Sequence, residues 1–428
     1  MHELTQLIRK DMVPALGVTE PGAIAFAVAK ARSYASGEPV HLSVAMNSGM
    51  YKNAFTCGIP NSEEVGPLFA AALGLAAGDP EKGLESLAGV SPEDNAAARK
   101  LIEEGRVSVR LSGITSRIFI RADLETAADR VSVTIRDRHT NVTKIVVNGK
   151  TLFETPDEHE AEASGAEAEP HVIHGYTLAQ IVDYIETVPI EEISFVSEAY
   201  RVNLELFKEG LDSPRTTFAR QLLSLNGGRV ISEDEQATAS LLCNAAIEAR
   251  VIGLDKPAMS ITGSGAHGII ATMPLYGVCR VNGLGEDKLY RATMLSYLVC
   301  TYIKEYSGRL SAFCGCAIAA GTGMACGLVW LKGGGVQEME YAINNMASSI
   351  TGMICDGGNQ GCTMKGIAAC DAAFRSAEFA MQGVHIERVH GINGRTPEET
   401  MRNMGLIASP GMTGTEKTIV EIFENKLE

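Results

Sequence analysis

The strongest chemical signal in the sequence is a concentration of cysteines toward the end of the chain. Six of the ten cysteines fall there: Cys314, Cys316, Cys326, Cys355, Cys362 and Cys370. Three thiolates from two loops can hold a [4Fe–4S] cluster by three irons and leave the fourth iron open to a substrate. The spacing matches neither a ferredoxin run nor a paired CxxC zinc site. The alternative is that these cysteines are simply small buried apolar residues.

Two of these cysteines flank a segment with turn chemistry. Cys355 and Cys362 enclose DGGNQG, whose Gly and Asn residues allow a tight loop that offers backbone N–H groups to sulfur. Cys314 and Cys316 lie on another predicted loop, within SAFCGC, just after a predicted helix. We therefore expect two separate stretches of chain to supply the thiolates.

The segment GSGAHG (263–268) formally satisfies the GxGxxG pattern of dinucleotide-binding proteins. The residues that follow, IIATMP, are β-branched and end at Pro274, where a dinucleotide site would begin a helix. We therefore predict a Gly-rich loop in which Gly263, Ser264 and Gly265 approach a small anionic ligand. His267 is then either a catalytic or ligand-contacting group or a structural histidine.

The segment TEPGA (19–23) resembles the start of a helix. Thr19 can cap the helix, Pro21 suits its first turn, and Glu20 favours the positive end of the helix dipole. Two interpretations stay open, namely capping alone and a helix end that binds the carboxylate of a substrate.

A second segment in the first half of the chain carries polar groups on a predicted loop. MYKNAFTCGIP places Lys52, Asn53 and Cys57 in a stretch with Gly58 and Pro60. Lys52 can pair with an anion there, or it can be an ordinary surface lysine.

The elements that must position these groups differ between the two halves of the chain. The first half has predicted helices at 4–36 (interrupted by Pro14, Gly17 and Pro21), 66–78 and 94–104, a strand at 41–51 and a loop at 52–62. Four segments between 106 and 153 are rich in β-branched residues and predict a small antiparallel sheet. The acidic stretch 155–170 has no apolar period and predicts a linker.

The second half is mostly helical by its apolar spacing. Helices are predicted at 178–187, 190–209, 213–224, 233–252, 287–306, 336–353, 364–383 and 396–406. The sequence therefore predicts an α+β protein, with a mixed N-terminal region at 1–175 and a helical, cluster-binding catalytic domain at 176–428. We expect that domain to pack on the N-terminal helix.

The balance of charged residues argues against nucleic-acid and membrane-surface partners. Lys and Arg number 37 and Asp and Glu 52, so the net charge is −15 at pH 7. A field of that sign repels phosphate backbones and anionic lipid head groups. The first residues lack the apolar core of a secretory signal, so we expect a cytoplasmic protein. We expect the uncharged run Cys314–Leu331, rich in Gly, Ala, Cys and Thr, to be a buried helix, not a membrane span.

Several ordered motifs together resemble a known family. They are TEP, MYKNAF with GIPNS, GSGAHGI, GRLSAFCGC, GMICDGGNQGCTMK and SPGM (409–412). Over almost its whole length the chain is similar to the L-cysteine desulfidase family, which is related to the alpha chain of bacterial L-serine dehydratase.

The resemblance implies an enzyme with an oxygen-sensitive [4Fe–4S] cluster that performs α,β-elimination on a small L-amino acid. By position the cluster ligands would be Cys314, Cys355 and Cys362, with Cys316 as the alternative to Cys314. His267 would be the first candidate for the base, and Lys52 the second catalytic group. The substrate would be bound by the first motif and by the two segments described above: Thr19, Glu20, Asn53, Gly263, Ser264 and Gly265.

One position departs from the family pattern. The desulfidases read GCTEP at the first motif, whereas this chain has Val18 in place of the cysteine. A valine can neither ligate iron nor transfer a proton, and Cys57 is one candidate to substitute for the missing thiol. The alternatives are L-serine deamination, a pyridoxal-phosphate lyase with a Schiff base on Lys52 or Lys365, and a non-catalytic metal-binding homologue. A homodimer is a further expectation.

Overall fold

The computed structural model describes residues 1–155, 171–308 and 310–426. It divides into two compact units. The helical unit consists of Met1–Pro14, His171–Cys355 and Gln360–Met412, and the sheet unit consists of Ala15–Pro170, Asp356–Asn359 and Thr413–Glu428. Helices dominate and one large sheet is segregated from most of them, which confirms the α+β class.

The sheet unit contains one six-stranded sheet in the order β3-β2-β4-β5-β6-β7. Its strands are β2 (Pro39–Asn47), β3 (Val107–Gly113), β4 (Phe119–Thr126), β5 (Arg130–Arg136), β6 (Val142–Val147) and β7 (Lys150–Glu154). β2 pairs in parallel with β3, with Val44 opposite Val109, and antiparallel with β4, with Val44 opposite Ala122. The remaining neighbours are antiparallel.

The strands predicted between 106 and 153 are confirmed. The sheet that they form also includes β2, which lies earlier in the chain. The antiparallel sheet expected from local sequence is a mixed sheet, because β2 inserts between β3 and β4. The reason is visible in the sequence of β2, where Val44, Ala45 and Met46 are all buried. A strand that is apolar on both faces belongs in the interior of a sheet, not at its edge.

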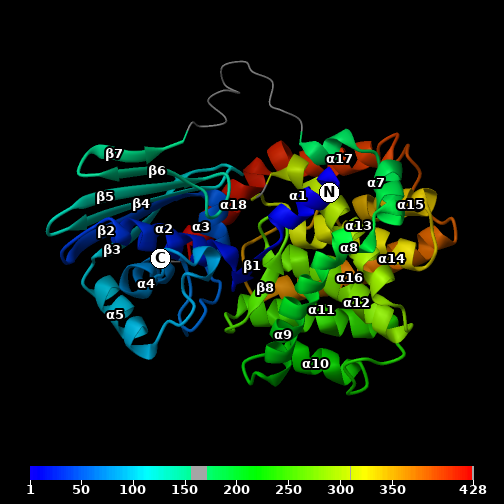
Figure 1. Ribbon diagram of the computed structural model, residues 1–428, viewed down its shortest axis with the longest axis horizontal. Helices are drawn as coiled ribbons and strands as arrows, with labels where there is room; N and C mark the ends of the chain where they lie inside the picture. The colour runs from blue at the N-terminus through cyan, green and yellow to red at the C-terminus, as the bar shows by residue number, and fades with distance from the viewer. Residues whose placement is uncertain (156–170, 309, 427–428) are drawn as a thin grey trace, which may run out of the picture. The chain divides into compact units, whose positions relative to one another are not determined.

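The sheet unit also contains the helices α2 (Thr19–Ser33), α3 (Ser48–Ala54), α4 (Pro67–Ala77), α5 (Pro92–Glu103) and α18 (Thr413–Glu424). Figure 1 shows α2 and α4 on one face of the sheet. Gly74 lets α4 approach α2, because a Cβ at this position would lie 2.7 Å from the Cα of Ala25. α2 is buried on nearly all sides, as its apolar composition predicts.

The helical unit is a set of packed helices, coloured mainly green to orange in Figure 1. They are α1 (Glu3–Asp11), α7 (Leu178–Thr187), α8 (Ile190–Ile193), α9 (Ser197–Asp212), α10 (Phe218–Leu225), α11 (Glu235–Val251), α12 (Gly265–Val281), α13 (Glu286–Ser307), α14 (Gly321–Leu331), α15 (Val336–Ile350), α16 (Gly361–Met381) and α17 (Pro397–Leu406). The predicted helices of the second half are confirmed, with shifts of a few residues at their ends, except that the predicted helix 190–209 is divided into α8 and α9 by a short 3₁₀ segment.

One prediction in this half was wrong. The residues after GSGAHG form α12, a helix that contains Pro274, and not the β-branched segment that the sequence suggested. Burial explains the difference, since Ile269, Ile270 and Met273 all pack in the core and tertiary packing overrides their weak local preference. The Gly-rich loop does therefore lead from a strand, β8 (Pro257–Ser260), into a helix. The parallel sheet of a dinucleotide-binding fold does not surround it in the described part of the chain.

The uncharged run Cys314–Leu331 is buried, as expected. It contains the π-helix η4 (Cys316–Ala320) and α14, whose residues from Gly321 to Val329 are all buried. Among the described residues no helix combines the length and apolarity needed to cross a membrane. Apart from Thr155, the predicted acidic linker lies outside the described residues.

Candidate functional site

The two cysteine-bearing loops meet in the helical unit. Phe313 and Ile354 form an isolated β-bridge. On either side of it the backbone N–H of Cys314 donates to the Met353 carbonyl at 3.0 Å, and that of Cys355 donates to the Ala312 carbonyl at 2.6 Å. The backbone therefore holds Cys314 and Cys355 on two adjacent, hydrogen-bonded segments, although about forty positions separate them in sequence.

Two further cysteines of the group, Cys316 and Cys362, lie at the starts of helical segments. Cys316 begins η4, and its side chain forms a hydrogen bond with the Cys314 thiol. This hydrogen bond and burial raise the pKa of Cys314 well above its usual value. Cys362 lies in the first turn of α16, which packs against η4. Within the described ranges, no three His, Cys, Asp or Glu side chains are arranged around one point as metal ligands would be.

The residues present nevertheless fit a thiolate-bound centre by their chemistry and backbone placement. Cys314 and Cys355 are on paired segments, and Cys316 and Cys362 follow each of them closely along the chain. A cysteine that binds a metal does so as the thiolate, so each of these side chains would release its proton on binding. The donor types therefore fit a thiolate-bound centre, and so does the backbone pairing of the Cys314 and Cys355 segments.

His267 lies directly against the backbone between Cys314 and Cys316. A Cβ at Gly315 would come within 2.8 Å of His267 Nε2 and 3.1 Å of Lys304 Cδ. Only glycine leaves room for the imidazole at this point. The structure thus brings together His267 and the CGC segment, which the sequence had offered as independent candidates.

The hydrogen bonds of His267 orient its ring. The Thr262 hydroxyl lies 2.5 Å from Nδ1 and donates to the Ile261 carbonyl at 2.7 Å. A hydroxyl that donates to this carbonyl accepts from Nδ1–H, which leaves the lone pair on Nε2, the nitrogen that faces Gly315. Burial lowers the pKa of His267 well below its usual value, and the charges of Lys304 and Arg250 lower it further. The imidazole is therefore neutral, with a free lone pair.

The Gly-rich loop shapes the start of α12. Gly263 has a φ of +79°, in the left-handed region that favours glycine, and follows Thr262 at +52°. Gly268 lets α12 pack on β8, because a Cβ there would lie 1.9 Å from the Met259 carbonyl oxygen. At Gly265 a Cβ would lie 2.8 Å from Arg250 Nε. The loop therefore carries the start of α12 close to the side chain of Arg250.

Arg250 was missed by sequence reasoning. It lies on α11, where every residue from Thr238 to Val251 is buried. The available signal was the composition of that helix, since a segment of small and apolar residues on all faces must bury any charge near its end.

In the sheet unit, the predicted loop position of Lys52 and Asn53 was wrong, because both lie on α3. Nor is Lys52 a surface lysine. Its side chain is fully buried and its Nζ lies 3.4 Å from Glu416 Oε2 on α18, which is also buried. Cys57 follows α3, is buried, and donates to the Ala54 carbonyl at 3.3 Å.

The carboxylate of Glu20 connects the polar side chains around the TEPGA segment (19–23). It accepts from Asn53 Nδ2 at 2.9 Å and from Thr19 Oγ1 at 3.0 Å, and His139 Nε2 lies 3.6 Å away. The prediction that Thr19 caps α2 was wrong, because the cap residue is Val18 and the Thr19 hydroxyl is used by Glu20.

The loop between Cys355 and Cys362 contributes four residues, Asp356–Asn359, to the sheet unit. Gly358 N–H donates to the Asn53 carbonyl at 3.1 Å. A Cβ at Gly357 would lie 2.4 Å from the Lys52 carbonyl oxygen, and one at Gly358 would lie 2.7 Å from Val18 Cγ1. Val18 therefore packs directly on the loop that joins the two cysteines.

The candidate residues thus form two groups. In the helical unit the structure places His267 against the CGC segment, with Gly263, Ser264 and Gly265 just before it at the start of α12. In the sheet unit it assembles Thr19, Glu20 and Asn53 through hydrogen bonds, with Lys52 beside Asn53 on α3.

Comparison with known proteins defines the class of protein to which this site belongs. Residues 81–421 match the family model described as serine dehydratase alpha chain, and the chain belongs to that family. Among its relatives is a UPF0597 protein of Clostridium botulinum, 38% identical over 428 residues, which cover 98% of each chain. A UPF0597 protein of Caldanaerobacter subterraneus is 34% identical, covering 99% of this chain and 98% of the relative. One from Bacteroides fragilis is 32% identical with the same coverage. Family membership points to an amino-acid dehydratase or lyase.

Proposed function

We propose that the protein is an iron–sulfur L-amino-acid lyase that converts L-cysteine to pyruvate, ammonia and sulfide. The observation that carries the proposal is the neutral imidazole of His267 set against Gly315, the residue next to the proposed cluster ligand Cys314. A base beside a metal-binding segment is the arrangement that α,β-elimination needs. The family membership and the resemblance to L-cysteine desulfidases support the same reaction.

The proposed cofactor is a [4Fe–4S] cluster held by Cys314, Cys355 and Cys362. When bound, an iron without a protein ligand supplies Lewis acidity to the substrate and its leaving group. Cys314 is preferred to Cys316 as a ligand because its segment is the one fixed by backbone hydrogen bonds to the Cys355 segment.

The protein groups carry the proton transfers. His267 Nε2 takes the Cα proton, and the thiol of L-cysteine leaves from Cβ as sulfide. The aminoacrylate formed takes up a proton at Cβ to become an imine, and water hydrolyses the imine to pyruvate and ammonia. The Thr262 hydroxyl keeps the reacting nitrogen of His267 oriented throughout.

L-Serine deamination is the second candidate substrate chemistry. Two observations favour it: the family model is that of a serine dehydratase, and Val18 stands where the desulfidases have a cysteine. The same proton transfers apply, with hydroxide as the leaving group.

We expect anaerobically reconstituted protein to produce keto acid from at least one of L-cysteine, L-serine, L-threonine and L-homocysteine. Keto acid and sulfide are measured separately, so that cysteine and serine chemistry give different signatures. Borohydride treatment serves as a control for a Schiff base on Lys52 or Lys365. Protein that carries a full cluster but forms no keto acid from any of these substrates would refute the proposed function.

Replacing the proposed base should separate catalysis from cluster assembly. We expect His267→Asn to retain iron and acid-labile sulfide but to lose about 10²–10⁴-fold in kcat, the usual contribution of a positioned general base. His390→Asn, at an exposed histidine of the same unit, is the matched control and should leave kcat unchanged. Unchanged kcat in His267→Asn would remove this residue from the mechanism.

A further inference from the structure

We propose that Arg250 and the start of α12 form the binding site for the α-carboxylate of the substrate amino acid. This inference deepens the proposed function and rests on it for the identity of the ligand. It is carried by a buried cation, a helix N-terminus and a glycine that lets the two approach each other.

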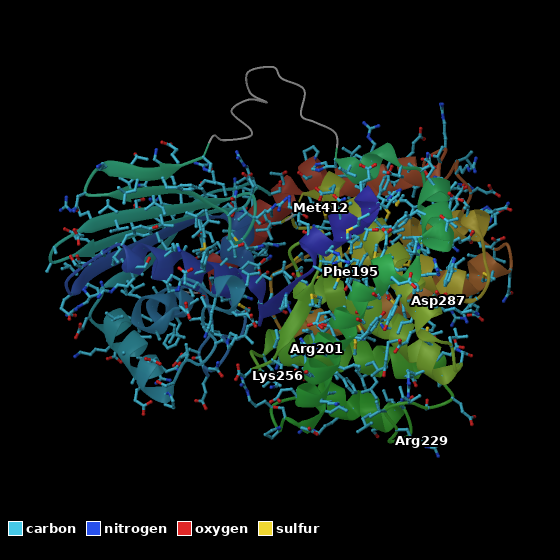
Figure 2. All side chains as sticks on the ribbon, viewed as in Figure 1. Phe195, Arg201, Arg229, Lys256, Asp287 and Met412 are labelled. Carbon is cyan, nitrogen blue, oxygen red and sulfur yellow. The ribbon has the colours of Figure 1, made fainter. Side chains whose placement is uncertain are left out.

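The guanidinium of Arg250 is buried in an unusual way. The residue is 4% exposed, and its Nε has no hydrogen-bond partner within the part of the chain that the structure describes. Other arginines of the helical unit behave differently: Arg229 extends from the edge of this unit in Figure 2, and Arg201 is exposed and paired with Glu198. A buried cation normally has a partner, because burying a charge without one is unfavourable. Arg250 is therefore available to bind an anion.

The anion site is completed by backbone donors. The N–H groups of Gly265, Ala266 and His267 are in the first turn of α12, where no preceding helical carbonyl can accept from them. The cap residue Ser264 makes no side-chain hydrogen bond to this turn. These donors and the positive end of the helix dipole favour a negative group at this end of α12.

Gly265 connects the two features. A Cβ at this position would come within 2.8 Å of Arg250 Nε and 3.3 Å of its Cδ. The absence of a side chain therefore lets the guanidinium stem lie against the first residue of the helix. Arg250 is aimed at the helix start, and not merely buried in the same region.

The surrounding charges favour an anion over a cation. Lys304 and Arg250 both act on His267 and lower its pKa. The opposing group is Asp11, whose carboxylate accepts from the Thr262 N–H. A planar guanidinium matches a carboxylate in shape and can bind it through two hydrogen bonds. In an amino acid the carboxylate is attached to Cα. A site that binds the carboxylate therefore fixes the position of Cα, the carbon from which His267 takes a proton.

Binding of a substrate analogue tests the proposal without turnover. L-Alanine has the α-carboxylate and α-amino group but no leaving group, whereas L-alaninamide lacks the carboxylate. By calorimetry on the reconstituted protein, we expect wild type to bind L-alanine and to discriminate strongly against L-alaninamide. Arg250→Met should weaken L-alanine binding about 100-fold, the effect of removing one partner of a buried charge pair. Arg250→Lys should lose less of its affinity for L-alanine, because lysine keeps the positive charge but cannot form the two parallel hydrogen bonds of a guanidinium.

The controls make each outcome decisive. Arg280→Met removes an exposed arginine at the other end of α12 and should leave L-alanine binding unchanged. Circular dichroism and iron content establish that each variant is folded and loaded. If Arg250→Met does not fold, the alaninamide preference of wild type and the Arg250→Lys affinity decide the question. Equal binding of L-alanine by wild type and a folded Arg250→Met overturns the proposal, as does wild-type binding of L-alaninamide with equal affinity.

Two further results separate this proposal from the proposed function. If L-alanine binding depends on Arg250 but no amino acid yields keto acid, the carboxylate site stands and the lyase assignment fails. If Arg250→Met forms keto acid with an unchanged KM, the lyase assignment stands and the carboxylate site fails. Inorganic phosphate is the probe for a different source of the anion, and phosphate binding as tight as that of L-alanine overturns the assignment to an amino acid.

Discussion

Cys355→Ala is expected to abolish iron incorporation and keto-acid formation together. Cys355 lies on the segment that is hydrogen-bonded to the Cys314 segment, and it is the proposed ligand at that position. The substitution removes one of the three proposed thiolate ligands, because alanine offers no electron pair to iron. The measurements are iron and acid-labile sulfide content, the broad visible absorption of the cluster, and the rate of pyruvate formation. Full iron content and full turnover in this variant would exclude Cys355 as a ligand.

The matched control is Cys326→Ala. Cys326 is buried in α14, and burial raises its pKa to about 12, so that it is an inert core thiol. We expect this variant to keep its cluster and its turnover, with only a modest loss of stability from the missing sulfur. Comparing Cys314→Ala with Cys316→Ala decides which of these neighbours is the ligand, and we expect only Cys314→Ala to behave like Cys355→Ala.

Lys52→Met is expected to destabilise the sheet unit by about 3–5 kcal/mol, the usual cost of breaking a buried ion pair by removing one partner. The substitution leaves the Glu416 carboxylate buried, with no hydrogen-bond partner for either oxygen in the described residues. The measurement is the midpoint of urea unfolding at neutral pH, followed by a probe in the sheet unit.

Removing both charges tests the cause of that loss. Lys52→Met combined with Glu416→Leu should recover much of the lost stability, because two apolar side chains then replace the pair. Lys417→Met is the control on the same helix, since its exposed pair with Glu421 should contribute less than about 1 kcal/mol. If Lys52→Met and Lys417→Met shift the midpoint equally, the buried pair does not stabilise the unit.

The helices of the second half were predictable because their apolar spacing is regular and their ends carry local signals. Thr177 and Gln180, for example, form a capping box at the start of α7. The start of α12 defeated the same logic, since Ile269, Ile270 and Pro274 are poor helix formers by local preference. The central place of β2 was equally hidden, because its partners β3 and β4 follow only after the helices α3, α4 and α5.

The site was predictable to the extent that motifs carry it. Residue type and spacing are enough to identify the cysteine segments, His267 and the Gly-rich loop in the sequence. The burial of Lys52 depends on Glu416, which lies near the other end of the chain, and no local pattern reports such a pair. The proposed role of Arg250 likewise depends on its closeness to Gly265, which lies on a different helix. Contacts of this kind follow from tertiary packing and have no signature in a window of sequence.

The π-helix η4 makes the length of its segment as constrained as its composition. A π-helical turn holds one residue more than an α-helical turn. Deleting one residue within Cys316–Ala320 would convert the wide turn into an ordinary one and keep the flanking residues in phase, whereas inserting one would rotate the preceding backbone by about 100°. Since α14 is buried and cannot turn, that rotation would fall on Cys314 and break its hydrogen bond to Met353. A single-codon insertion here would therefore do more damage than most substitutions, even though it spares every cysteine.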